Sequence, residues 1–122
     1  MPFALIILFE KQNKIICNSK GIACDHMTIG FDAKKVFYNY IKGRTHQHDM
    51  TVGPQILKKK NKKFYDLIRC FYNITGIPAV LNTNLNQHRN PISSSLEDVI
   101  NTFKASGLKY LYLEDQYLIE KK

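Results

Sequence analysis

The sequence predicts a single α/β or α+β domain, because strand-like and helix-like segments alternate along one chain of 122 residues. A chain of this length allows one domain with a core that needs no metal or disulfide. Hydrophobic residues at 44% and charged residues at 23% exclude a disordered or fibrous protein. No apolar run approaches the roughly 20 residues of a membrane-spanning helix, so we expect no membrane segment.

The first half of the chain is predicted to be mostly extended. Its strand-like runs are residues 3–10, 14–17, 27–31 and 50–57. A loop is expected over 18–25, around Gly21, and a short, weakly helical stretch over 33–41. The last run is extended because Pro54 biases Gly53 away from the helical region.

Helical periodicity marks the second half of the chain. Apolar residues recur at three- and four-residue steps between Lys62 and Thr75, which predicts an amphipathic helix. Its apolar stripe would consist of Phe64, Leu67, Ile68, Phe71 and Ile74. Ser95 and Asp98 form an S-x-x-D capping pattern that begins a second helix, which ends near Gly107. Strands are expected over 77–81, 110–113 and 117–119.

The three cysteines indicate a reducing compartment. Their number is odd and no C-x-x-C spacing is present, so neither a disulfide framework nor a zinc knuckle is expected. Cys70 lies within the helical pattern and is predicted to be a small core residue. The apolar segment 2–9 has no basic residue before it and no cleavage site after it, which favours a buried strand over a signal peptide. A cytoplasmic location is therefore expected.

The chain carries 18 Lys and Arg against 10 Asp and Glu, a net charge of +8. Five of the lysines lie in the run 58–63, so the excess is local and can attract phosphates. No RNP-like strand, zinc-finger spacing or base-reading helix accompanies it, so specific nucleic-acid binding is not expected. A solvated loop is the ordinary interpretation. A basic module that binds nucleic acid or an acidic partner stays open as an alternative.

A polar loop, residues 82–86, follows directly after the predicted strand 77–81. Its asparagines and threonine supply amide and hydroxyl donors at the carboxyl end of a strand, where α/β sheets tend to bind ligands. Such residues also cap turns, so the loop alone predicts no reaction. His46 and His48 would share one face of an extended segment, but two histidines without further ligands do not predict a metal site.

Between residues 26 and 120 the chain contains an ordered series of motifs. Residues 49–55 read D-M-T-V-G-P-Q, residues 64–68 read F-Y-D-L-I, and residues 75–86 read T-G-I-P-A-V-L-N-T-N-L-N. Further matches lie in 91–92, 95–98 and 103–108. The series resembles the C-terminal part of NodU/CmcH-type carbamoyltransferases, which have D-x-T-x-R-P-Q, F-Y-x-L-I, and T-G-I-P-x-x-L-N-T-S-F-N-x-x-G-E-P-I.

The resemblance implies a YrdC-like fold, a twisted mixed sheet flanked by helices, here incomplete relative to the family. Residues 26–122 would form this domain, and 1–25 would be an unmatched strand or hairpin. The family's domain activates carbamoyl phosphate with ATP and Mg, giving carbamoyl-adenylate and pyrophosphate. A separate ASKHA-type domain then transfers the carbamoyl group to a hydroxyl. The positions that match the ligand pocket are Asp49, Thr51, Gln55, Asn82, Thr83 and Asn86, with Asn84 as a substituted member. The resemblance assigns no catalytic residue and no metal ligand in this chain.

Departures from the family pattern concern its anion-binding groups. Gly53 replaces the arginine of D-x-T-x-R-P-Q, which removes a bidentate phosphate donor. Asn84 replaces the serine of N-T-S-F-N, and Arg89 and Asn90 replace the G-E pair. The family's upstream cationic segments and its transfer domain have no counterpart in these residues. We therefore expect a remnant of the activating domain that is inactive or impaired alone. Alternatively, the chain is a subunit that needs an ASKHA-type partner carrying the transfer domain.

Overall fold

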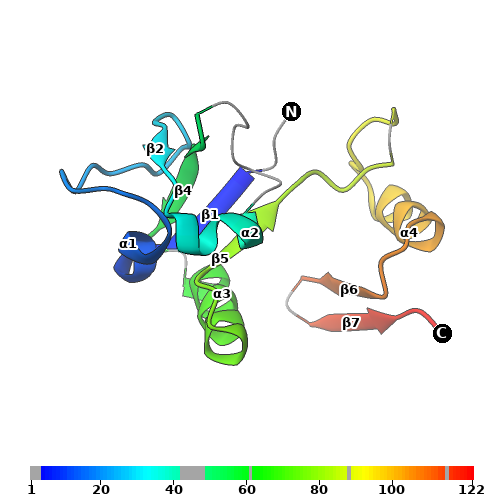
Figure 1. Cartoon of the computed structure of the whole chain (residues 1–122). Helices are drawn as coiled ribbons and strands as arrows, with labels where there is room; N and C mark the ends of the chain where they lie inside the picture. Colours follow the sequence, from blue (N-terminus) through cyan, green and yellow to red (C-terminus); the bar gives the residue numbers. More distant parts are fainter. Residues whose placement is uncertain (1–3, 42–48, 61, 88, 115) are drawn as a thin grey trace. The chain divides into compact units, whose positions relative to one another are not determined.

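Figure 1 shows the computed structural model, which describes residues 4–41, 49–60, 62–87, 89–114 and 116–122. The chain divides into two compact units, a first unit of Met1–Thr83 and a second unit of Asn84–Lys122, and each is described by itself. Helices and small sheets occur in both units, which confirms the predicted α+β class. Among the described residues, no helix is long and apolar enough to cross a membrane.

A three-stranded mixed sheet forms the centre of the first unit. Its central strand is β1 (Ala4–Leu8), which runs parallel to β4 (Pro54–Leu57) and antiparallel to β5 (Ala79–Asn82). The side chains from Leu5 to Leu8 are all buried. A strand covered on both faces reads as a continuous apolar run, which explains why this segment shows no alternation. The sheet therefore depends on a strand that lies before residue 26.

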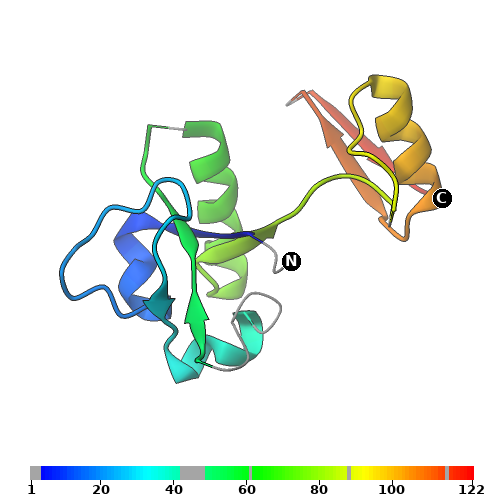
Figure 2. The same cartoon turned by 90° about the horizontal axis from the view of Figure 1, so that it is seen from above.

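Two apolar cores lie on the two faces of this sheet. Leu5 and Ile7 point into a core that includes residues of α1 (Gln12–Ile15), α2 (Tyr38–Ile41) and the two-stranded sheet of β2 (Phe31–Asp32) and β3 (Thr51–Val52). Ile6 and Leu8 point to the other face, against α3 (Lys62–Thr75). Figure 2 shows α3 and α2 on opposite sides of β1. The layers are thus helix, sheet and helix.

Two of the predicted strands are wrong in whole or in part. The segment 14–17 does not continue as a strand, because the chain turns through η1 (Phe9–Lys11) into α1, where Gln12 and Ile15 are buried one helical turn apart. Only Ile16 forms an isolated bridge, with Ala33. The predicted strand 27–31 is reduced to β2, and the predicted weak helix over 33–41 is confirmed by η2 (Lys35–Phe37) and α2.

Helix α3 has the predicted bounds but a different buried face. Tyr65 and Ile68 are its buried residues, whereas Leu67 is 58% and Ile74 is 84% exposed. The prediction that Cys70 is a core residue is wrong, because its side chain is exposed. The helix packs on a narrow sheet through one side, so Phe64 still contacts the core while Leu67, Phe71 and Ile74 of the apolar stripe are exposed.

The second unit contains one helix and one hairpin. Helix α4 (Leu96–Ala105) begins with the predicted capping box: Ser95 Oγ accepts from Asp98 N–H, and the Asp98 carboxylate accepts from Ser95 N–H. The two predicted strands are confirmed as β6 (Tyr110–Leu113) and β7 (Tyr117–Glu120), and they pair antiparallel. Lys121 Nζ donates to the backbone carbonyls of Phe103, Lys104 and Ser106, at 3.2, 2.7 and 2.7 Å. This lysine joins the hairpin to the end of α4.

Candidate functional site

The start of β4 and the end of β5 lie at the same end of the first unit's sheet. In the register of the sheet Leu5 is opposite Pro54, and Ala4 is opposite Asn82. Gly53, which precedes Pro54, therefore falls in the same row as Ala4 and Asn82. Two strand spacings separate the backbones of Gly53 and Asn82, which is about 10 Å. The structure thus brings the glycine of the D-x-T-x-R-P-Q motif to the same row as the first asparagine of the polar loop.

Gln55 and Asn82 project from one face of the sheet. Gln55 is opposite Ile6, and Ile6 is opposite Val80, which lies two residues before Asn82 on the same strand. Side chains two residues apart on a strand share a face. Gln55 is half-buried and Asn82 is exposed. Both amides can donate to and accept from a ligand that reaches this end of the sheet.

Asp49 and Thr51 bind each other. The Asp49 Oδ1 atom accepts hydrogen bonds from the Thr51 N–H at 3.0 Å and from the Thr51 hydroxyl at 2.9 Å. The residue between them, Met50, has a φ of +57°, in the left-handed region that a side chain seldom adopts. The Asp49 carboxylate therefore stabilises the bend that leads into β3. This geometry makes Asp49 a positioning residue for the segment that ends at Gly53.

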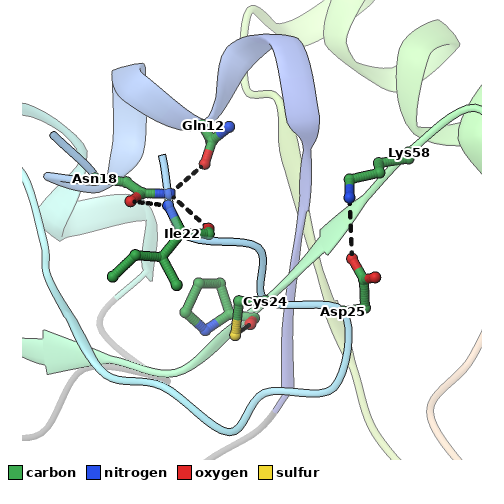
Figure 3. Close-up of polar contacts among 7 residues, drawn as sticks. Gln12, Asn18, Ile22, Cys24, Asp25 and Lys58 are labelled. Carbon is green, nitrogen blue, oxygen red and sulfur yellow. Dashed lines mark hydrogen bonds and ion pairs between the residues drawn. The ribbon is translucent and has the colours of Figure 1, made fainter. Parts of the chain in front are cut away.

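A buried polar cluster in the loop 18–25 contacts β4, which follows Gly53 (Figure 3). The thiol of Cys24 donates to the Pro54 carbonyl at 3.0 Å, and the Cys24 carbonyl accepts from Ile56 N–H at 2.7 Å. Nearby, the Asn18 side chain binds the Gln12 side chain and both backbone groups of Ile22. These contacts hold the loop 18–25 against β4. They fix the backbone on which Gln55 sits.

The remaining predicted residues lie at the unit boundary and in the second unit. Thr83 is the last residue of the first unit and is exposed, as is Asn84. The Asn86 amide donates to the Asn90 carbonyl at 2.8 Å, and Asn90 N–H donates to the Gln87 carbonyl at 3.0 Å. Asn86 thus closes a loop by binding backbone. Five of the predicted residues belong to the first unit, and Asn84 and Asn86 belong to the second.

In this loop Arg89 has a φ of +71°, which lies in the left-handed region. This is the position at which the family pattern has the glycine of its G-E pair. Glycine adopts positive φ without steric cost, so the conformation of this loop agrees with the family's residue better than with arginine. Arg89 thus adopts the backbone conformation that the family's glycine would adopt most readily.

A hollow of about 370 Å³ in the second unit was not predicted. It lies between this loop and α4, and it is lined by Gln87, Asn90, Pro91, Ile92, Ser93, Ser94, Asp98, Asn101, Thr102 and Ala105. Hydrogen bonds from the Ser95 side chain and from the backbone N–H groups of Ser94 and Ser95 lower the pKa of the Asp98 carboxyl. The spacing of Asp98, Asn101, Thr102 and Ala105 is that of one helix face. This three- and four-residue spacing of polar and small side chains is the sequence pattern from which the hollow could have been predicted.

Metal ligands do not converge in the described part of the chain. No group of three or more His, Cys, Asp or Glu side chains among these residues could hold a metal ion. His46 and His48 lie outside the described residues, so the expectation that they share one face of an extended segment stays a prediction. The polar groups of the candidate site are amides and hydroxyls, which bind oxygen-rich ligands by hydrogen bonding.

The sequence of this chain is similar to those of known proteins. A family model described as "Carbamoyltransferase C-terminus" matches residues 1–121, a range that includes the first 25 residues. The chain is 40% identical to an uncharacterized protein of Methanocaldococcus jannaschii, over 99% of this chain and 23% of that protein. A second uncharacterized protein of that archaeon is 32% identical, over 99% and 19%. Nodulation protein NolNO of Sinorhizobium fredii is 30% identical, over 99% and 18%. The chain spans about a fifth of the length of these relatives.

Proposed function

The chain belongs to the carbamoyltransferase C-terminus family, and we propose that it keeps the frame of a pocket for ATP and carbamoyl phosphate while binding both ligands weakly. The observation that carries the proposal is the row Gly53, Ala4 and Asn82 at one end of the sheet. The polar loop reaches this row, but the position at which the family pattern has arginine holds a glycine. The frame is therefore present where the strongest anion donor is missing.

In the proposed reaction, water cleaves carbamoyl phosphate to carbamate and inorganic phosphate, and a carbamate oxygen then displaces pyrophosphate from the α-phosphorus of ATP, accompanied by Mg, giving carbamoyl-adenylate. Gln55, Asn82 and Thr83 would orient the ligands' oxygen atoms through neutral hydrogen bonds. Neutral donors bring no positive charge to a phosphate and cannot form the bidentate ion pair that arginine forms with it. A hydrogen bond to a charged group contributes about 1.5–3 kcal/mol, which corresponds to roughly a 10- to 100-fold change in affinity. We assign no acid–base role to any of these residues.

The test restores the missing cation. ATP binding, with Mg present, is measured by isothermal titration calorimetry for the unmodified chain and for Gly53→Arg. Roughly 10- to 100-fold tighter binding is expected for Gly53→Arg. Gly53→Gln is the control, because it adds a polar hydrogen-bonding side chain without charge. Equal affinities for the two variants would contradict the proposal, as would pyrophosphate exchange by the unmodified chain at the rate of Gly53→Arg.

A second proposal concerns partners. From the family resemblance we infer that carbamoyl transfer to a hydroxyl takes place on an ASKHA-type polypeptide that this chain assists. Co-purification of the chain with such a protein from its own cells tests this inference. Recovery of the chain without it, under conditions that preserve other complexes, would argue against a split enzyme.

A further inference from the structure

The structure joins lysines that are distant in sequence. Lys11 and Lys14 lie on η1 and α1, and their Nζ atoms are each 5.3 Å from the centroid of the Tyr72 ring on α3. The Lys14 ammonium also donates to the Tyr72 hydroxyl at 2.9 Å, and this hydrogen bond lowers the pKa of Tyr72. Two cations from the start of the chain therefore lie beside the helix that follows the lysine run.

The lysine run itself meets the same elements nearer the start of α3. Lys59, Lys62 and Arg69 line a hollow of about 480 Å³ together with Tyr65 and Asp66. Tyr65 donates to Glu10, so η1 is tied to α3 at this point. Lys58 Nζ lies 5.8 Å from the centroid of the Phe9 ring, which is 47% exposed. These contacts bring six basic residues together. We call them the basic surface: Lys11, Lys14, Lys58, Lys59, Lys62 and Arg69.

The carboxylates on the basic surface do not neutralise it. Glu10 accepts from Tyr65, and this hydrogen bond, together with burial, raises the pKa of Tyr65, which stays a donor. Asp66 lies 3.7 Å from Arg69, and Asp25 lies 3.9 Å from Lys58. Three carboxylates thus face six cations. Like charges this close repel one another unless a polyanion or salt screens them.

We propose that the basic surface binds the phosphate backbone of single-stranded nucleic acid without reading its base sequence. This goes beyond the proposed function. Lysine ammonium groups are compact point charges, which suit phosphates spaced along a strand. The 14 residues of α3 extend over about 21 Å, long enough to follow several phosphates. The exposed ring of Phe9 beside Lys58 provides a face on which an unpaired base can stack, a feature that an acidic protein would not require.

The test is a fluorescence-anisotropy titration of the whole chain with a labelled oligouridylate at about 50 and 200 mM salt. Four to six phosphate contacts predict a slope of log affinity against log salt of about −3 to −4, or roughly 50- to 300-fold weaker binding at the higher salt. Absence of binding at the lower salt, or affinity that salt does not change, overturns the proposal.

The decisive variant is Lys11→Gln with Lys14→Gln, because these lysines belong to the surface but not to the run. Its slope should be shallower by about 1.4, since each lost contact removes about 0.7. Lys59→Gln with Lys62→Gln should give the same change. Lys104→Gln with Lys122→Gln, in the second unit, lowers the net charge equally and should leave the slope unchanged.

Three further outcomes overturn the proposal. The first is unchanged binding by the Lys11 and Lys14 double variant, which would reduce the surface to the lysine run alone. The second is an equal loss in the control variant, which would show dependence on net charge. The third is competition by poly-glutamate as effective as that by RNA, which would assign the surface to an acidic protein. Far-UV circular dichroism of each variant shows that it is folded.

Discussion

Replacing Arg89 by glycine should stabilise the second unit. The turn from Gln87 to Asn90 is closed by the Asn90 N–H, which donates to the Gln87 carbonyl at 3.0 Å, and Arg89 has a φ of +71° at its third position. Positive φ at that position of a turn favours glycine. A side chain in the left-handed region costs about 1–2 kcal/mol. The greater freedom of unfolded glycine offsets about 0.5–1 kcal/mol, so a net gain of about 0.5–1 kcal/mol is expected.

Native-state hydrogen exchange of the amides in residues 84–122 measures this gain locally. A gain of this size slows exchange about two- to five-fold for amides that open with the unit. Arg89→Ala is the matched control, because it removes the same guanidinium but keeps a Cβ atom in the left-handed region. If Arg89→Ala slows exchange as much as Arg89→Gly, the effect comes from charge, and the reasoning from backbone geometry is wrong.

Three further predictions concern the second unit. Ser95→Ala should lower its free energy of unfolding by about 1 kcal/mol in urea titrations, because the Asp98 N–H loses its cap, and Glu97→Ala should change it less. Because the pKa of Asp98 is lowered in the folded state, its carboxylate stabilises the fold above the unfolded pKa near pH 4, and this stability is lost as the pH falls through the folded pKa. Asp98→Asn should therefore reduce the loss of unfolding free energy at acid pH, and an unchanged acid dependence would contradict this. Lys121→Met should cost about 1–2 kcal/mol, because three carbonyls at the end of α4 lose their charged donor; Lys122→Met, at the exposed terminal residue, should be silent.

Local patterns predicted the elements whose stabilising contacts lie close in sequence. The capping box of α4 is such a case, because Ser95 and Asp98 satisfy each other's backbone groups within one turn. Helix α3 is another, since its 14 residues carry the periodicity and Gly76, with a φ of +75°, ends it. The hairpin of β6 and β7 is also local. In each of them the local pattern agrees with the observed type and bounds of the element.

Long-range packing decided the features that periodicity missed. Residues 14–17 contain enough apolar side chains for a strand, but burial of Gln12 and Ile15 against the first core favours a helical turn. The apolar stripe of α3 could not reveal that Tyr65, rather than Leu67, faces the sheet. The order of motifs does not show that Lys11 and Lys14 reach Tyr72, because Lys14 and Tyr72 are 58 residues apart in the sequence.

The motif residues that this chain keeps form hydrogen bonds within its loops, whereas the arginine that it lacks would have supplied positive charge. Asp49 and Asn86 are kept, and each binds nearby polar groups of the chain, one across the left-handed Met50 and the other across the turn that contains Arg89. Such contacts maintain a loop whether or not a ligand is present. The arginine that Gly53 replaces would have contributed charge rather than backbone support. Under the proposed function, loss of charge with retention of loop-forming residues would leave the fold intact and weaken anion binding. If the Asp49 and Asn86 contacts serve the loops, removing either should destabilise its unit before any ligand is added.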